Sequence, residues 1–325
     1  MPDLSGIAGY ASTFMLMALV NGIVCLGLNL QWGQTGLFNV GVAGFVAIGA
    51  YTSALLTTPV TDAHAGGLAL PVIAGWLAAM LAAGAASALI GAATLRLRAD
   101  YLAITTFGVA AIVQLVALNA QTLTGGPFGI ANIPRPFEML VSRPLLFSLA
   151  NLALLATLVG VIYVALERLV RSPWGRVLRA IREDERAAAA LGKNAARYRL
   201  EAFALGGALM GLAGAVQAHV IGFIAPENYQ SSLTFQVWAM LIIGGSGNNL
   251  GALAGAGLVT LIWSATGLAT GAFFPPDEQA RAAALRVVAI GALLSLTLVL
   301  RPRGLFGERA AVSRHIVRGG HRQRP

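Results

Sequence analysis

The charged side chains of this chain gather in one stretch, residues 168–199, which reads RLVRSPWGRVLRAIREDERAAAALGKNAARYR. It holds nine of the 22 basic residues and lies between two long apolar runs. A cation at membrane depth costs about 2.5–3.5 kcal/mol, so this stretch must lie in water beside a membrane. Its available chemistry is ion pairing and hydrogen bonding to another macromolecule. We interpret it as a docking surface; the alternative is a solvated loop that is basic only because of membrane topology.

The spacing of apolar residues within this stretch predicts one helix over 174–191. Pro173 suits its first turn, and Gly192 suits a C-terminal cap with positive φ. Acidic and basic side chains would then pair within one turn of the helix. These side chains are Glu183, Asp184, Glu185, Arg179, Arg182 and Arg186.

Side chains that could catalyse a reaction are few and scattered. The four histidines are far apart in the sequence, and neither paired carboxylates nor a Ser/His/Asp arrangement is present. Lys193, the only lysine, lacks the upstream Gly and the following Ser or Thr of a phosphate-binding loop. Cys25, the only cysteine, lies in an apolar run, which excludes an intramolecular disulfide and a cysteine-based metal cluster. We therefore expect no enzyme, no metal and no cofactor in this chain.

The composition is that of an integral membrane protein. Of 325 residues, 57% are hydrophobic and 11% charged, which leaves too little polar surface for a soluble domain of this size. The net charge of +9 does not indicate nucleic acid, because aromatic residues are few and the first 95 positions hold no Lys or Arg. No basic residue precedes the first apolar stretch, so we expect it to remain as a span and not to be cleaved as a signal peptide.

A helix needs about 20 apolar residues to cross the hydrocarbon, and the chain has eight such runs and one shorter run. They cover 9–30, 37–56, 68–95, 101–118, 145–166, 200–221, 233–243, 250–268 and 282–300. The seventh run would rise only about 16 Å, so it spans only if the GGSGNN that follows lies at membrane depth. Such an interrupted helix exposes backbone groups that can bind a polar solute.

The distribution of basic residues predicts the topology. Arg96 and Arg98, the 168–199 stretch and the seven arginines from Arg301 onward would all be cytoplasmic under the positive-inside rule. That arrangement requires nine crossings, with the N-terminus outside and the C-terminus in the cytoplasm; eight crossings remain an alternative. We expect a membrane domain over 1–307 and a basic, disordered tail over 308–325.

Several motifs resemble one family of transporter subunits. They are LRLRADYLAITTFG (95–108), LTGGPFGI (123–130), RPRGLFG (301–307), GQTGLFNVGVAGFVAIGAYTSALL (33–56) and the block 172–215. These motifs come in the family's order along the chain, from about Asn29 to Gly307, and they resemble the LivM-type permease of branched-chain amino acid ABC transporters. The first two favour the LivM-type over the related LivH-type permease.

The resemblance implies that the 168–199 stretch docks onto an ATPase subunit. The positions that match the family's docking motif are Glu185, Ala187, Ala188, Leu191 and Gly192. The glutamate lies one residue further from the glycine than in ABC importers generally, because position 186 is arginine. Arg179 and Arg182 flank the motif and can pair with acids on the partner.

The resemblance also implies the partners. They are a second permease subunit (LivH-type), two ATP-binding subunits (LivG-type and LivF-type) that hold ATP and Mg, and a periplasmic amino-acid-binding protein. The resemblance implies that the chain lies in the bacterial inner membrane, in contact with lipid. We expect no nucleic acid among its partners.

If this interpretation is right, uncharged polar groups and backbone line the solute path. Each candidate has the alternative role of a helix–helix hydrogen bond or a turn. The candidates are Asn29, Gln34, Asn39, Thr105, Thr106, Gln114, Thr124, Gly125, Gly126, Gln236, Ser246, Asn248 and Asn249. Two other functions stay open: the same type of transporter with urea or a short amide as substrate, and a stand-alone facilitator for a small polar solute.

Overall fold

The computed structural model describes residues 4–60, 66–97, 99–273 and 304–307, and ten separate positions between 281 and 300. These residues form helices, and the strand-like pairing found among them is one antiparallel bridge between Ile130 and Ile224. The long helices are α1 (Leu4–Leu28), α2 (Val42–Thr57), α3 (Val72–Thr94), α4 (Ala99–Asn119), α6 (Pro144–Arg171), α7 (Pro173–Glu183), α9 (Ala195–Ile221), α10 (Ser231–Gly244) and α11 (Asn249–Phe273). The short elements are a π-helix η1 (Asn29–Gly33), α5 (Gln121–Thr124), α8 (Glu185–Ala190) and the 3₁₀ turns η2 (Gly126–Phe128), η3 (Glu138–Leu140) and η4 (Pro226–Tyr229). The predicted all-α polytopic bundle is confirmed.

Six described helices are long and apolar enough to cross a membrane: α1 with its π-helical end, α3, α4, α6, α9 and α11. Two more are apolar but short. The 16 residues of α2 and the 14 of α10 rise about 24 and 21 Å, less than the roughly 30 Å of a hydrocarbon core. The short seventh segment is therefore confirmed as α10.

The second short helix corrects a prediction. We expected a continuous helix over 37–56, but α2 begins only at Val42, and residues 34–41 follow an irregular path. Two contacts explain the late start. The Oδ1 atom of Asn39 accepts the Gly41 amide at 2.8 Å, and Gly41 lies so close to α4 that a Cβ there would be 2.5 Å from the Thr106 carbonyl oxygen. Apolar composition predicts burial and does not by itself predict where a helix begins.

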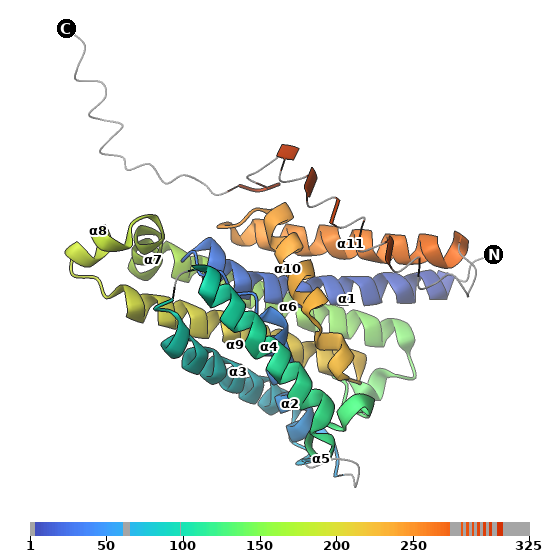
Figure 1. Cartoon of the computed structure of the whole chain (residues 1–325). Helices are drawn as coiled ribbons and strands as arrows, with labels where there is room; N and C mark the ends of the chain where they lie inside the picture. The colour runs from blue at the N-terminus through green and yellow to red at the C-terminus, as the bar shows by residue number, and fades with distance from the viewer. Residues whose placement is uncertain are drawn as a thin grey trace.

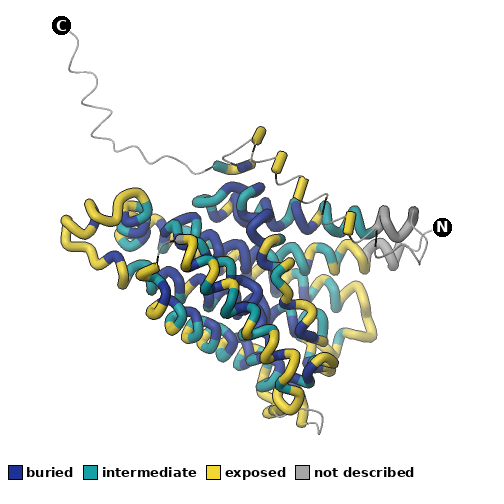
Figure 2. Tube along the Cα trace, viewed as in Figure 1, coloured by how far each residue is buried: buried dark blue, intermediate teal, exposed yellow. Residues whose placement is uncertain are grey.

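Helix α9 occupies the middle of the bundle, where it packs against α1, α2 and α3. Its buried residues are mostly small, which lets the neighbouring backbones approach closely. Gly207 and Gly211 illustrate this, because a Cβ at Gly207 would lie 2.3 Å from the Cβ of Ser87, and one at Gly211 would lie 2.3 Å from the Cβ of Ala83, both on α3. Figure 2 shows the buried residues gathered in this central layer.

Large apolar side chains are exposed on the outside of the bundle. Leu81 and Leu89 on α3 and Ile104 on α4 are 75%, 74% and 69% exposed. Apolar side chains this exposed on helices long enough to span a membrane are the expected lipid contacts.

The two ends of the bundle differ. The N-terminus of α1 lies at one end, and α7 and α8 lie at the opposite end (Figure 1). Of the predicted ninth segment, 282–300, only separate positions belong to the described residues, and the predicted tail 308–325 lies outside them.

Candidate functional site

The predicted docking region, residues 168–199, includes α7, which is held firmly against the bundle. Leu178 and Ile181 are 0% and 1% exposed, and the indole of Trp174 donates to the Glu201 carboxylate on α9 at 2.8 Å. The helix therefore presents one buried apolar face and one polar face to water, as the charge pattern predicted.

The predicted single helix over 174–191 is wrong, because it breaks at Asp184. The backbone of Asp184 is extended, with φ −150° and ψ 104°, and its carboxylate accepts the Ala187 amide at 3.0 Å. Asp184 is thus the N-cap of a new helix, α8, a role for which aspartate is well suited. The break also changes the charge pairing. Glu185 forms an ion pair with Arg199 at 2.7 Å, not the predicted pair with an arginine of its own helix.

The proposed docking residues divide into an outward set and an inward set. Leu191 is 80% exposed, and Ala187 and Gly192 are exposed beside it. Ala188 instead packs into a small cluster with Ile181. The structure therefore places one large apolar side chain and a flat, small-residue surface at the tip of the docking region.

The remaining docking candidates lie on either side of this surface. The Glu185 side chain is 49% exposed and Arg179 is half-buried. Arg182 turns toward the bundle, where its guanidinium donates to the carbonyl oxygen of Gly33 at the end of the π-helix. This contact joins α7 directly to the π-helical end of the first segment.

The predicted cap at Gly192 is confirmed. Its φ is +74°, and its amide donates to the carbonyl of Ala189 at 2.9 Å, while the Lys193 amide donates to Ala188 at 3.2 Å. No atom lies within 4 Å of the place that a Cβ would take. The glycine is required here by backbone conformation and not by packing within this chain.

A cavity of about 1390 Å³ lies between α1, the end of α9, α10 and α11. Its wall is mainly apolar and aromatic, with uncharged polar groups between. Three of the five tryptophans line it, namely Trp32, Trp238 and Trp263, together with the amides of Asn21, Gln217 and Gln236. No Asp, Glu, Lys or Arg belongs to the part of this wall that the structure describes.

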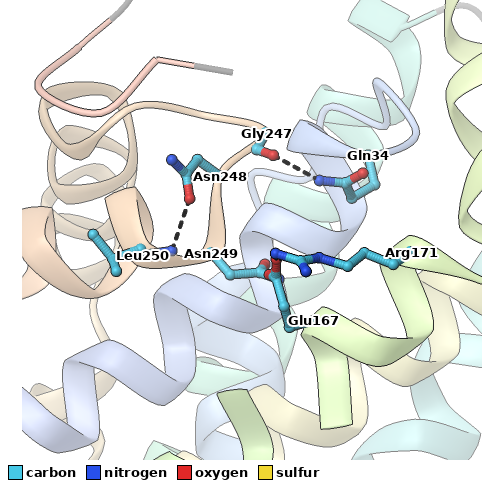
Figure 3. Close-up of polar contacts among 7 residues, drawn as sticks. All are labelled: Gln34, Glu167, Arg171, Gly247, Asn248, Asn249 and Leu250. Atoms are coloured by element: carbon cyan, nitrogen blue, oxygen red, sulfur yellow. Dashed lines mark hydrogen bonds and ion pairs between the residues drawn. The ribbon is translucent and has the colours of Figure 1, made fainter. Parts of the chain in front are cut away.

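A buried hydrogen-bond network joins the π-helix at the end of α1 to the 245–248 loop and the start of α11. The amide of Asn29 donates to Oδ1 of Asn249 at 2.9 Å and accepts the Gly247 amide at 2.8 Å. Asn249 donates in turn to Glu167 at 3.0 Å, and Glu167 pairs with Arg171 at 2.6 Å. Figure 3 shows Asn249 and Arg171 meeting at the Glu167 carboxylate. With Asn29, the network runs from η1 through α11 to the end of α6.

The loop after the π-helix joins the same network. Gln34 donates to the carbonyl of Gly247 at 2.9 Å (Figure 3). Its Oε1 atom is buried and has no hydrogen-bond partner in the described part of the chain. Gly33 permits this approach, because a Cβ there would be 2.5 Å from the Gly247 amide nitrogen.

The solute-path candidates fall in different places. Gln236 and Ser246 line the cavity. Asn29, Gln34 and Asn249 belong to the network, and Asn248 accepts the Leu250 amide at 3.0 Å at the start of α11.

The other candidates hold local backbone. Asn39 accepts from Gly41 and donates to Gln31 at 2.7 Å, and Thr106 accepts the Val40 amide at 3.0 Å. Thr105 bonds to its own helix through the Tyr101 carbonyl, and Gln114 is half-buried on α4. Thr124, Gly125 and Gly126 form a turn at the opposite end of α4, where both glycines have positive φ and the threonine bonds to the carbonyls of Ala117 and Ala120.

Sequence reasoning missed the aromatic residues of the cavity and one acidic residue. Trp32, Phe38 and Trp238 meet only in three dimensions, so no spacing in the sequence reveals them. Glu167 falls between the 145–166 run and the 168–199 stretch and was given no role, although its i,i+4 spacing from Arg171 is typical of a helical ion pair. The described residues contain no group of three or more His, Cys, Asp or Glu side chains that could hold a metal.

Comparison with known proteins agrees with this arrangement. Residues 10–298 match the family described as "branched-chain amino acid transport system / permease component". The chain is 34% identical to the high-affinity branched-chain amino acid transport system permease protein LivM of Escherichia coli (strain K12), over 89% of this chain and 68% of that protein.

More distant relatives extend the comparison. The probable branched-chain amino acid transport permease protein LivM of Methanocaldococcus jannaschii is 27% identical, over 90% of this chain and 91% of its own length. The guanosine ABC transporter permease protein NupQ of Bacillus subtilis (strain 168) is 30% identical, over 69% of this chain and 71% of its own. No solved structure matches the chain. The chain is therefore a multi-pass membrane protein that belongs to the family of permease components of branched-chain amino acid transport systems.

Proposed function

We propose that this chain is the permease subunit of an ATP-driven importer that takes up branched-chain amino acids across the bacterial inner membrane. The observation that carries the proposal is the cavity beside α1 and α10, with its aromatic and amide lining, in a chain of this family. An apolar wall suits an aliphatic side chain, and neutral side-chain amides suit the two charged ends of a zwitterion. At about 1390 Å³ the cavity exceeds the roughly 300–1,000 Å³ of an ordinary small-molecule site, as a passage for solute would.

The docking region supports the proposal that other subunits supply the energy for transport. Its exposed surface of Ala187, Leu191 and Gly192 offers an apolar side chain and a flat backbone, which suit insertion into a groove of a partner. We propose that two ATP-binding subunits bind here and hold ATP and Mg. A second permease subunit and a periplasmic amino-acid-binding protein complete the transporter.

We also propose nine crossings, with the N-terminus outside and the C-terminus in the cytoplasm. The amides of Leu305 and Phe306 donate to the carbonyls of Ile243 and Gly244 at 2.9 Å. Gly244 ends α10, and the Phe306 carbonyl lies beside Gly251 at the start of α11. The other end of α11 lies near the N-terminus of α1 (Figure 1). A chain that leaves α11 at one end and is at the other end by residue 305 supports one more crossing between them.

Within the proposed path, Gln236 and Ser246 touch the solute. Asn29, Gln34, Asn39, Asn248 and Asn249 hold the interrupted backbone that shapes the wall.

Uptake into liposomes tests the proposal. The tagged chain is purified from its native membrane with its attached subunits, which mass spectrometry identifies, and is reconstituted with its binding protein. We expect uptake of labelled leucine, isoleucine and valine that requires ATP. Gln236→Ala should reduce this uptake at least several-fold, while the matched control Gln114→Ala, outside the cavity, should not.

The competing functions give different results. Uptake without ATP by a chain that co-purifies with no ATPase would identify a facilitator. Inhibition by urea or guanosine, with none by leucine, would assign another solute to the same transporter class.

A further inference from the structure

A second, smaller void adjoins the large cavity at Trp32 and Ser246. This void of about 300 Å³ is lined by Trp32, Gly33, Gly36, Arg182 and Ser246. Trp32 and Ser246 also line the large cavity. These two residues therefore form the partition between the cavity and the void beside the docking helix α7.

Trp32 in this partition belongs to an aromatic cluster with Phe38 and Trp238, which line the large cavity. The ring of Trp32 lies 5.2 Å from that of Phe38 and 5.3 Å from that of Trp238, and the last two rings are 4.7 Å apart. The rings are tilted or edge-to-face, an arrangement that aromatic pairs favour and that leaves little space between them. Trp238 is fixed further by its indole, which donates to the Asn39 carbonyl at 2.9 Å.

Trp32 is carried by an unusual piece of backbone. It lies in the π-helix Asn29–Gly33, and π-helical turns occur frequently at functional sites. Asn29 anchors the start of this turn to Gly247 and Asn249. Gln34 directly follows the turn, and its buried side-chain Oε1 atom has no hydrogen-bond partner among the described residues, so the polar groups beside the turn are not all satisfied in the present arrangement.

The end of the π-helix is held by the docking helix. Arg182 donates to the carbonyl of Gly33, the residue after Trp32, and its Cγ would be 3.3 Å from a Cβ at Gly36. A movement of α7 therefore acts on the backbone that carries Trp32, without any intervening residue.

We propose that Trp32, Phe38 and Trp238 form the cytoplasmic gate of the solute path, closed in this structure, and that Arg182 couples its opening to the docking helix. The inference rests on the proposed function, because it assumes that the cavity is the path and that α7 binds an ATPase. Solute would leave the cavity past Trp32 and Ser246 once the rings separate.

Cysteine accessibility tests the gate without reference to the solute. Gln236 lines the large cavity but not the smaller void, and the native Cys25 is fully buried, so a cysteine at position 236 reports on the cavity. We would measure how fast a charged thiol reagent labels Gln236→Cys in the assembled transporter when added from the cytoplasmic side. Trp32→Ala and Trp238→Ala should each raise this rate at least tenfold.

Three controls accompany this measurement. Trp32→Phe keeps a ring and should keep the slow rate, and Trp263→Ala removes a cavity tryptophan outside the cluster and should also keep it. Labelling from the outside should be equal in all variants, which shows that the cavity is intact and the chain is folded. An unchanged cytoplasmic rate in folded Trp32→Ala and Trp238→Ala would overturn the gate.

The coupling has its own measurement. Nucleotide binding to the assembled transporter should change the labelling rate of Gln236→Cys, and Arg182→Ala should abolish that change, whereas Arg176→Ala on the same helix should preserve it. Retention of the change in Arg182→Ala would overturn the coupling. A failure of the proposed function would look different: the gate variants would still change labelling, but no ATPase would co-purify and nucleotide would have no effect.

Discussion

The Nδ2 atom of Asn29 donates to Oδ1 of Asn249 across 2.9 Å, although the two residues lie 220 positions apart in the chain. Both side chains are buried, at 0% and 4% exposure. The bond ties the π-helix η1 to the start of α11, at the place where the π-helix meets the 245–248 loop. This junction is the natural place to begin testing the structure.

Replacement of Asn29 with alanine should destabilise the chain. It would leave Oδ1 of Asn249 and the Gly247 amide buried without a partner, at a cost of about 1–3 kcal/mol for such a group. We would measure the free energy of unfolding in mixed micelles. Asn119→Ala is the control, because that side chain is exposed and bonds only within its own helix. Equal stability of the two variants would mean that water or lipid satisfies the junction.

Substitutions of Glu167 and Asn249 should have non-additive effects on the free energy of unfolding. Asn249 donates to Glu167 at 3.0 Å, so once either side chain is removed the second removal costs less. We expect a double-mutant cycle with Glu167→Ala and Asn249→Ala to give a coupling free energy of at least about 0.5 kcal/mol. Glu167→Gln keeps an acceptor and should lose less stability than Glu167→Ala, because the ion pair with Arg171 is largely exposed on the arginine side. Strict additivity would contradict the contact.

Substitutions at Gly192 should distinguish its effect on the stability of the chain from its effect on docking of the ATPase. A side chain at its positive φ costs about 1–2 kcal/mol but meets no neighbour within this chain. Gly192→Ala and Gly192→Trp should therefore be destabilised to a similar, small extent. Only the bulky variant should lose the co-purifying ATPase and ATP-dependent uptake, while Gly192→Asn, which tolerates this conformation, should retain both. Unaltered uptake with Gly192→Trp would remove the docking role.

Charge reversal at Glu185 should uncouple ATP hydrolysis from uptake. Glu185→Arg breaks the 2.7 Å ion pair with Arg199 and also changes the charge presented to a partner. The swapped variant Glu185→Arg with Arg199→Glu restores the pair within the chain but not the outward charge. If Glu185 contacts the ATPase, the swapped variant stays uncoupled; recovery of uptake would show that the residue acts only by positioning α8.

The topology predicts which face each end of the bundle presents. Cysteines at Ser172 and Ala310 should be labelled only from the cytoplasm, and a cysteine at Met139, which is 94% exposed at the opposite end, only from outside. Because the native Cys25 is fully buried, the chain without an added cysteine should not be labelled. Ala310 lies outside the described residues, so this labelling is an independent test of the ninth crossing. Labelling of Ala310→Cys from outside would exclude nine crossings with the N-terminus out.

Much of the bundle could be predicted from the sequence, because apolar runs of membrane length leave few alternatives to a helix. The seventh segment was recognised as short from its length alone, and Gly192 as a cap from its position after the helical spacing. The late start of α2 was missed because Leu37 and Phe38 are as apolar as the helix that follows, while the backbone there is fixed by contacts with Thr106 on α4. The break at Asp184 was missed because an aspartate between two helical patterns can be read either as a helical residue or as a cap.

The candidate site was harder to predict, since its parts come from opposite ends of the chain. Polar residues drew attention in an apolar sequence, yet most of them, such as Asn39 and Thr106, satisfy backbone groups around the interruptions. The residues that close the cavity are aromatic, and aromatic side chains in a membrane protein carry no local sign of a role. Trp32 and Trp238 acquire theirs only when α1 and α10 are packed together.

The junction at Asn29 also has a consequence for how the chain is made. Its partners Gly247 and Asn249 follow it by 218 and 220 positions, so at about 5–20 residues per second the ribosome reaches them roughly 10–45 s after Asn29. During that interval the side-chain amide of Asn29 must remain without these two partners, beside lipid or within the insertion machinery. The first segment to be synthesised is therefore among the last to reach its final conformation, and truncations before α11 should leave it open to membrane proteases.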